Sequence, residues 1–406
     1  MMVASASGCG LWRAEIDASL DRITEGYRFS FFQWEVDHLL RKGRLTPEAA
    51  ALLQAAEEPR ALVEEYLSMN GSVRSLRSRL QRLAAEGAPA ADRAQVLEEL
   101  ADLEGRHETL SDAAGTVLAR QITDALSERG IRHPADRWID LDVVFPPVWF
   151  EIAQPPHVLV VSPREEIAKY REVMLVQGLE TDEMERIEAD VQALGYSALV
   201  VRLGGFGGLY PALVAESSSL PFLLEAATEE WLHQYLAFTP LGFRYVLSLL
   251  HISRSYEIAT LNETVAGIVS EEVARDVLAT HYPEQLPGVS PPPEPADPEA
   301  FSFPREMRRI RLHVDDLLAA GEIEEAEAFM EERRRFLLTQ GYYIRRLNQA
   351  YFAFHGTYAA EPTSVDPIGT EVQALRAESA SLSEFLNRMV TITSRAQLRE
   401  VLGIAD

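Results

Sequence analysis

The sequence predicts an α+β protein in which α-helices predominate. Stretches rich in Leu, Ala, Glu and Arg carry apolar residues at helical spacing over residues 11–130 and 305–348. Residues 138–161 and 197–203 are instead rich in β-branched and aromatic residues, and the first of these stretches contains two Pro-Pro pairs. Such a composition is typical of short strands joined by turns. We therefore expect an N-terminal helical hairpin, a core with a small β-sheet and a C-terminal helical bundle.

The length and the proline distribution predict how these parts follow one another. A chain of 406 residues is expected to form two or three domains. We expect an N-terminal helical, coiled-coil hairpin domain over 1–135 and an α+β core over 136–282. Residues 283–304 include Pro291-Pro292-Pro293 and predict a linker or extended strap. A C-terminal helical domain over 305–406 completes the prediction.

The N-terminal part is expected to be helical throughout. Helical spacing covers Arg13–Lys42, and Thr46-Pro47 has the residues of a helix start, with Thr at the cap and Pro in the first turn. The helices Ala61–Ala85 and Ala91–Arg129 are separated by Gly87-Ala88-Pro89. Their apolar positions form a seam of coiled-coil type: Leu76, Leu80, Leu83, Val96, Leu97, Leu100 and Leu103. This hairpin is the surface through which a homodimer would form.

The middle of the chain alternates between strands and helices. We expect a buried strand at Val158–Val161, and a helix that is capped by Ser162-Pro163-Arg164 and runs to about Leu175. An amphipathic helix over Thr181–Leu194 and a strand over Ser197–Leu203 follow.

The glycine-rich run Gly204-Gly205-Phe206-Gly207-Gly208 has two interpretations. It is a tight turn that needs positive φ, or a segment lying against a site, where bare backbone approaches a substrate. The second interpretation assigns Gly205 and the nearby Tyr210 to substrate binding. No P-loop lysine and no dinucleotide-binding pattern follow the run.

Helices account for most of the rest of the chain. The expected helices are Leu220–Phe238, Phe243–His251, Tyr256–Leu278, Arg305–Leu318, Ile323–Asn348, Leu382–Met389 and Arg395–Leu402, and the aromatic segment Tyr351–Tyr358 turns at Gly356.

The charge of the chain excludes several partners. Its 38 basic and 63 acidic residues give a formal net charge of −25, which repels nucleic acid and anionic membranes. No apolar run approaches the ~18 residues of a transmembrane helix.

Cys9 is the single cysteine, so neither an internal disulfide nor a cysteine-rich zinc site is expected. The N-terminus has no apolar signal-peptide region, although Ala6-Ser7-Gly8-Cys9 resembles the end of a lipoprotein signal. We expect a cytoplasmic protein, with a lipid-anchored or exported form as the alternative.

A polar group within an apolar helix indicates a metal site. In Ala226–Phe238, Glu229 and His233 are four residues apart and share a helix face, with Glu230 beside them. Burying such a group is costly unless something compensates it, and a divalent metal ion would do so. The pattern E-E-x-x-H is one residue away from H-E-x-x-H, in which two His bind zinc and the Glu works as general base.

Together with Asn262-Glu263-Thr264-Val265-Ala266, this pattern resembles the gluzincin-type metallopeptidases, and in particular bacterial relatives of predicted aminopeptidases. The resemblance covers about Val158–Leu278 and rests on E-E-x-x-H and on the downstream N-E-x-x-A. It implies a peptidase that acts on a peptide or protein substrate. Its single divalent metal, zinc first, would be held by Glu229, His233 and Glu263, with Glu230 as the base.

The resemblance also implies groups for substrate binding. In gluzincins a Tyr or His stabilises the oxyanion, and Tyr351, His355 and Tyr358 are candidates for that role. A sheet edge upstream of the metal helix binds peptide by strand addition, and Tyr210–Glu216 occupies that position in the sequence.

Glu229 departs from the pattern, since a histidine is usual at that position. Two carboxylates and one imidazole place two negative charges on the metal ion and make it a poorer Lewis acid. More oxygen ligands also weaken the preference for zinc over manganese or iron.

Three alternatives remain open. The chain is a non-catalytic relative that acts as a protein-binding scaffold, or these glutamates are solvated surface residues around a hydrogen-bonded core histidine. The third is a carboxylate-bridged di-iron protein, because Glu35/His38 and Glu104/His107 repeat the E-x-x-H spacing. The β-rich middle of the chain argues against the third.

Overall fold

The computed structural model describes residues 6–34, 45–85, 89–134, 141–249, 252–253, 255–286, 301–356 and 367–404. Helices predominate, and the strands form two three-stranded sheets. The predicted α+β, predominantly helical fold class is therefore confirmed.

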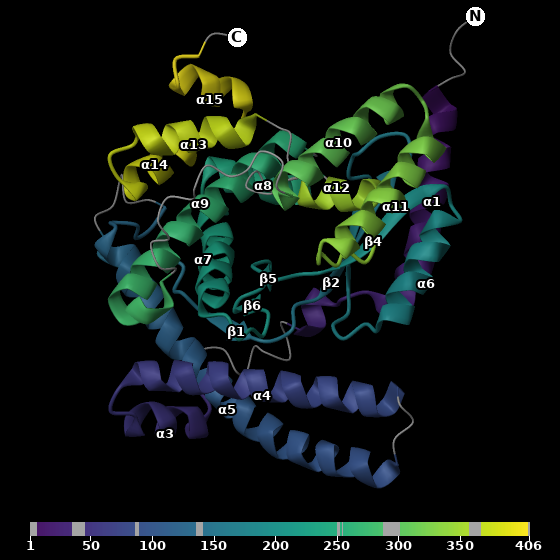
Figure 1. Ribbon diagram of the computed structural model, residues 1–406. Coiled ribbons are helices and arrows are strands. Elements are labelled where there is room, and N and C mark those ends of the chain that lie inside the picture. The colour runs from purple at the N-terminus through teal and green to yellow at the C-terminus, as the bar shows by residue number, and fades with distance from the viewer. Residues whose placement is uncertain are drawn as a thin grey trace, which may run out of the picture. The chain divides into compact units, whose positions relative to one another are not determined.

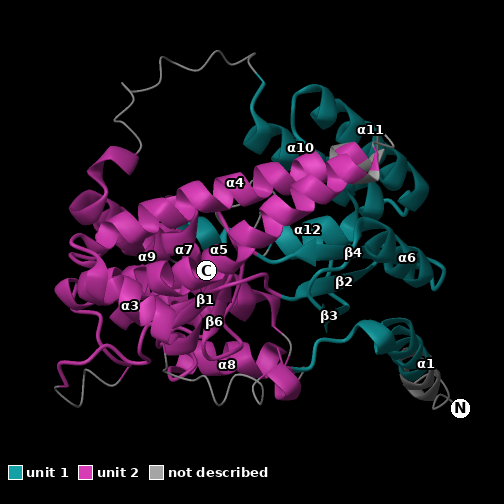
Figure 2. Cartoon of the chain, turned by 90° about the horizontal axis from the view of Figure 1, so that it is seen from below, with its two compact units in different colours: residues 1–30, 156–203, 293–370 teal, residues 31–155, 204–292, 371–406 magenta. Residues whose placement is uncertain are grey.

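The chain divides into two compact units, each assembled from three separated stretches (Figure 2). Unit 1 comprises residues 1–30, 156–203 and 293–370, and unit 2 comprises residues 31–155, 204–292 and 371–406. Both units thus draw on several of the four consecutive segments predicted from the sequence, whose boundaries stay a prediction.

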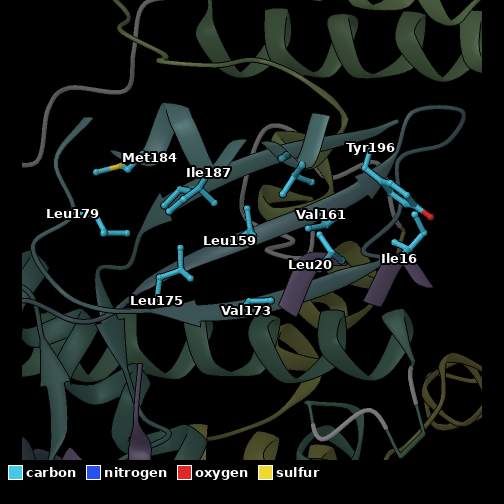
Figure 3. Packing of buried hydrophobic residues seen from close by; sticks show 13 residues of the cluster. Ile16, Leu20, Leu159, Val161, Val173, Leu175, Leu179, Met184, Ile187 and Tyr196 are labelled. Carbon is cyan, nitrogen blue, oxygen red and sulfur yellow. The ribbon is translucent and has the colours of Figure 1, made fainter. Parts of the chain in front are cut away.

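Unit 1 is built on an antiparallel sheet with helices on both faces. Its central strand β2 (His157–Pro163) pairs with β3 (Arg171–Leu175) and β4 (Tyr196–Arg202). Because side chains alternate along a strand, Leu159 and Val161 face α1 (Ala6–Thr24) and α6 (Thr181–Gln192), as Figure 3 shows. Val158 and Val160 pack on the other side with α12 (Gln349–His355).

A helical hairpin completes unit 1. Helices α10 (Phe303–Ala319) and α11 (Ile323–Thr339) are joined at Gly321, whose φ of +79° suits glycine. A buried ion pair links separate parts of the unit: Glu188 on α6 is fully buried and is paired with Arg345 and Arg346. Its carboxylate also accepts a hydrogen bond of 2.7 Å from the backbone of Val200 in β4.

Three predictions in this part of the chain are wrong. The helix expected over Ile323–Asn348 ends at Thr339. Residues up to Leu175 were expected to be helical, but residues 171–175 form β3 because they pair along the length of β2. The helix expected over Arg13–Lys42 is interrupted after Thr24 by the 3₁₀ turn η1 (Glu25–Tyr27), and helical backbone returns at residues 31–34. Arg28 then bridges to Leu175, so pairing with the edge of β3 replaces helix. Residues 35–42 lie outside the described residues.

The first helices of unit 2 form the predicted hairpin. Helix α3 (Pro47–Ala55) begins at Thr46, whose side chain accepts the backbone N–H of Ala49 as a cap. Helices α4 (Pro59–Ala85) and α5 (Ala90–Glu128) run side by side (Figure 1). Their apolar seam contains Val73, Leu76, Leu80, Leu83, Val96, Leu100 and Leu103. Leu97, which was predicted to belong to the seam, is half exposed.

A second small sheet lies in unit 2. Strand β6 (Ala212–Val214) is its middle strand, parallel to β1 (Phe150–Ile152) and antiparallel to β5 (Gly205–Phe206). The prediction that Tyr210–Glu216 forms the sheet edge is therefore wrong, because β1 and β5 occupy both sides of β6. The edge strand β5 is itself part of the glycine-rich run.

The remaining helices of unit 2 surround this sheet and one another. Helix α7 (Leu220–Leu236) contacts the sheet and packs along α9 (Tyr256–His281), with α8 (Pro240–Leu249) between them in sequence and η2 (Pro283–Gln285) after α9 (Figure 1). The last helices are α13 (Ile368–Glu378), α14 (Leu382–Met389) and α15 (Arg395–Val401). Helix α13 was not expected from the sequence. Glu272 on α9 accepts hydrogen bonds from Arg129 and Arg376, which ties the ends of α5 and α13 to α9. None of the described helices combines the length and apolar character that a membrane span needs.

Candidate metal centre

Helix α7 contributes two of the candidate ligands. It begins where the Ser219 side chain accepts the backbone N–H of Phe222, with Pro221 in the first turn. Most of its other positions are buried apolar residues, which hold the helix in the interior of unit 2. Glu229 and His233 project from successive turns of the same face, and both are partly buried.

Helix α9 contributes the third candidate ligand, Glu263. It begins at Ser255, which caps the backbone N–H of Ile258, and most of its first half is buried. Glu263 lies there with a side chain that is 8% exposed. One ligand atom each from Glu229, His233 and Glu263 lies within 4.8 Å of the others. These three residues could therefore hold a metal ion.

Hydrogen bonds orient two of the three ligands. Nδ1 of His233 lies 2.8 Å from Oδ1 of Asn262, and since an amide oxygen only accepts, Nδ1 carries the proton. In the neutral imidazole, Nε2 then keeps its lone pair, 3.6 Å from Oε2 of Glu263. The hydroxyl of Tyr245 on α8 donates to Oε1 of Glu263 at 2.5 Å, and its ring stacks on that of His233. Hydrogen bonds of this type, from residues that do not bind the metal to residues that do, fix the orientation of metal ligands.

The donor set fits a divalent cation. Oε2 of Glu263 is buried and has no hydrogen-bond partner, an arrangement that costs free energy unless the charge is compensated. An ion at the common point of the three ligands would provide that compensation. One imidazole nitrogen and two carboxylate oxygens are ligands that zinc, manganese and iron all accept.

The pKa shifts of Glu229 and His233 also favour a bound cation. Burial raises the pKa of Glu229, and the neighbouring Glu263 raises it further, against the lowering effect of His233. Burial lowers the pKa of His233, but the carboxylates of Glu263, Glu230 and Glu229 outweigh it and the net pKa is raised. Crowded carboxylates bind protons tightly for the same reason that they bind a cation, because a bound proton or a bound cation lowers the electrostatic repulsion between the carboxylates.

Glu230 lies against the glycine-rich run. A Cβ atom on Gly205 would lie 2.8 Å from Cδ and Cγ of Glu230, and one on Gly207 would lie 2.8 Å from its Oε2. Only glycine leaves room for this approach of the backbone to the carboxylate. Burial raises the pKa of Glu230, while His233 and a hydrogen bond from the Gly207 backbone lower it in part. Neither glycine has positive φ, so the tight-turn interpretation does not hold at these two positions. The close approach is to the Glu230 side chain, and contact of Gly205 with a substrate stays a prediction.

Two further side chains of α7 hold the surroundings of Glu230. Gln234 donates to the carbonyl oxygen of Leu209 at 2.7 Å, which fastens the end of the glycine-rich run to the helix. The buried Trp231 donates to the carbonyl oxygen of Pro146 at 2.7 Å. The loop before β1 and the loop between β5 and β6 are thus both anchored on the helix that carries two of the three candidate ligands.

The other predicted site residues have different surroundings. Tyr210 donates its hydroxyl to the carbonyl oxygen of Pro147 at 3.1 Å, and its ring packs edge-on against Trp149. Tyr351 and His355 belong to α12 in unit 1, where their ring centroids are 4.3 Å apart. Burial lowers the pKa of His355 to about 4. Tyr358 lies outside the described residues.

The second E-x-x-H copy does not resemble a metal site. Glu104 is ion-paired with Arg77 at 2.9 Å, and the ring of His107 packs against that of Tyr66. Within the described part of the chain, Glu229, His233 and Glu263 form the single cluster of this kind. The Glu35/His38 copy lies outside that part.

Tyr245 is the residue of this centre that sequence reasoning missed. It belongs to an apolar helix with no metal motif, and its contact with Glu263 depends on how α8 packs against α9. The contact of Asn262 with His233 could have been predicted from the sequence, since Asn262 is adjacent to Glu263 in the N-E-x-x-A segment.

Comparison of the chain with family models, with curated proteins and with solved structures finds no match. The resemblance to gluzincins therefore stays a prediction from the motif residues.

Proposed function

We propose that the chain is a metal-dependent peptidase in which Glu229, His233 and Glu263 hold one divalent ion and Glu230 is the general base. The observation that carries the proposal is the convergence of three ligand atoms from α7 and α9 within 4.8 Å of one another. The unpartnered Glu263 oxygen and the Asn262–His233 hydrogen bond support it.

Zinc is the ion that we propose first. Manganese and iron are the alternatives, because a site with two carboxylates and one imidazole favours them more than the usual site with two imidazoles and one carboxylate does. When bound, such an ion supplies Lewis acidity for polarising a peptide carbonyl and acidifying water. Glu230 would accept the proton of the attacking water at its carboxylate and pass it to the leaving amine.

The edge strand β5 is the proposed position of the substrate backbone. It pairs with β6 on one side, and its Gly205 backbone lies against Glu230. A peptide that adds to this edge by main-chain hydrogen bonds would bring its carbonyl groups past the base. The oxyanion role of Tyr351 and His355, and the substrate contact of Tyr210, stay predictions.

Turnover of a peptide library with the Glu230→Gln variant as control tests the proposal. The wild type should cleave peptides once loaded with metal, and Glu230→Gln should bind the same amount of metal with turnover reduced at least about 100-fold. Equal turnover in both proteins would exclude Glu230 as the base.

A second candidate function follows from Glu229 itself. A carboxylate in the usual histidine position weakens the Lewis acid, and a chain that binds metal without hydrolysing any peptide would be a non-catalytic scaffold. The same library distinguishes the two, since a scaffold shows metal binding but no cleavage in either protein.

A further inference from the structure

The two oxygens of the Glu263 carboxylate have different surroundings. Oε1 accepts the hydroxyl of Tyr245 at 2.5 Å, while Oε2 is buried, has no hydrogen-bond partner and lies 3.6 Å from Nε2 of His233. One oxygen is therefore engaged by α8, and the other belongs to the ligand cluster.

This asymmetry bears on how Glu263 would bind an ion. A glutamate chelates through both oxygens only if both lone pairs face the metal. An oxygen that accepts a short hydrogen bond from a phenol has part of its electron density committed and its orientation fixed. The stacking of the Tyr245 ring on His233, at 24° between the planes, keeps the hydroxyl from swinging away.

We propose that Tyr245 is a positioning residue that restricts Glu263 to a single bond to the metal and so keeps a coordination position open. The inference rests on the metal site of the proposed function, but not on peptide hydrolysis. It matters in this chain because two of the three ligands are carboxylates. If Glu263 bound through both oxygens, the protein alone would supply four ligand atoms, and water or substrate could bind only as a fifth ligand.

The variant Tyr245→Phe isolates the hydroxyl, since it keeps the ring and its stacking on His233. The readout is the visible spectrum of the protein loaded with Co²⁺, whose absorption weakens as the coordination number of the ion rises above four. We expect a clearly weaker band in Tyr245→Phe than in the wild type, with Co²⁺ bound at least as tightly. If the peptidase is active, kcat should fall with little change in KM, because an ion with a fifth ligand would polarise the reacting groups less while substrate binding is kept.

Tyr282→Phe is the matched control. Tyr282 is another buried tyrosine of unit 2 whose hydroxyl donates to a side chain, Gln121. It follows the last residue of α9, nineteen positions after Glu263, or about 28 Å along a helix. This variant should leave the Co²⁺ spectrum unchanged.

Three outcomes separate this inference from the proposed function. An unchanged spectrum in Tyr245→Phe, with Co²⁺ bound, overturns the role of Tyr245 and leaves the metal site standing. A wild type that binds no Co²⁺ overturns the metal site and this inference together. A weakened spectrum without peptide cleavage supports the inference and counts against the peptidase.

A crystal structure of the zinc-loaded wild type tests the inference without any variant. It should place one Glu263 oxygen about 2.0–2.2 Å from the ion and the other on the Tyr245 hydroxyl. Two Glu263 oxygens at bonding distance would overturn the inference.

Discussion

Replacing Gly205 by alanine should displace the proposed general base. The added Cβ would lie 2.8 Å from Cδ and Cγ of Glu230, where ordinary contacts begin at 3.4 Å, and it would overlap Oε1 directly. The carboxyl group must therefore move by about 1 Å. Misplacing a catalytic group by that distance typically lowers the rate about 100-fold, and overpacking of this kind costs about 1–3 kcal/mol of stability.

The assay is peptide turnover together with metal content and urea unfolding. We expect Gly205→Ala to keep its metal, to lose about 100-fold in kcat and to unfold at a lower urea concentration. Gly71→Ala is the control, since Gly71 lies within α4 and a Cβ there would meet no atom within 4 Å. It should keep full turnover and gain up to about 1 kcal/mol. If Gly205→Ala retained wild-type turnover, the assignment of Glu230 would be refuted.

The remaining predictions concern the ligands, the fold and pH. Asn262→Ala should weaken metal binding about 10–100-fold, measured by competition with a chelator, because the histidine ligand loses the acceptor that orients it. Glu188→Gln should destabilise unit 1 by about 3–5 kcal/mol in urea unfolding, since it leaves Arg345 beside a buried neutral group. Glu331→Gln, at an exposed ion pair, should cost no more than about 1 kcal/mol. The metal-free protein should lose stability as pH rises from the ordinary carboxyl value of 4.5 through the raised pKa of Glu229, because the folded state holds that proton more tightly than the unfolded state. Urea unfolding at several pH values should show a smaller loss in Glu229→Gln, and an identical pH profile in the two proteins would contradict this assignment.

Elements with their own local signals could be predicted from the sequence. Helices α4, α5, α7 and α9 have long apolar patterns at helical spacing, and β2 is a continuous apolar run. The pairing of Glu229 with His233 followed from a spacing of four residues within one helix. These features depend on residues close together in the chain, which is why they could be predicted.

Features that depend on distant partners could not. The segment Arg171–Leu175 has no strand pattern strong enough to exclude helix, and its conformation is decided by pairing with β2. The same strand pairs with Arg28, in a segment that the sequence predicted to be helical. Ala212–Val214 reads as a strand, but its middle place in the sheet depends on β1, about 60 residues earlier in the chain.

The candidate site divides in the same way. The motif residues and Asn262 could be found from the sequence. The contact of the Tyr245 hydroxyl with Glu263 could not, because it depends on the packing of α8 on α9. The glycines of the run were ambiguous, because a glycine needed for positive φ and one needed for close approach look alike in a sequence. Which of the two applies at Gly205 depends on Glu230, 25 positions later in the chain.

The metal content of the purified chain tests the central claim most directly. Protein prepared without chelators, and again after incubation with zinc and with manganese, should contain about one divalent ion per chain by mass spectrometry. The Glu263→Ala variant, folded by circular dichroism, should contain almost none. A wild type that takes up no metal, or a variant that keeps the wild-type amount, would contradict a metal centre at Glu229, His233 and Glu263.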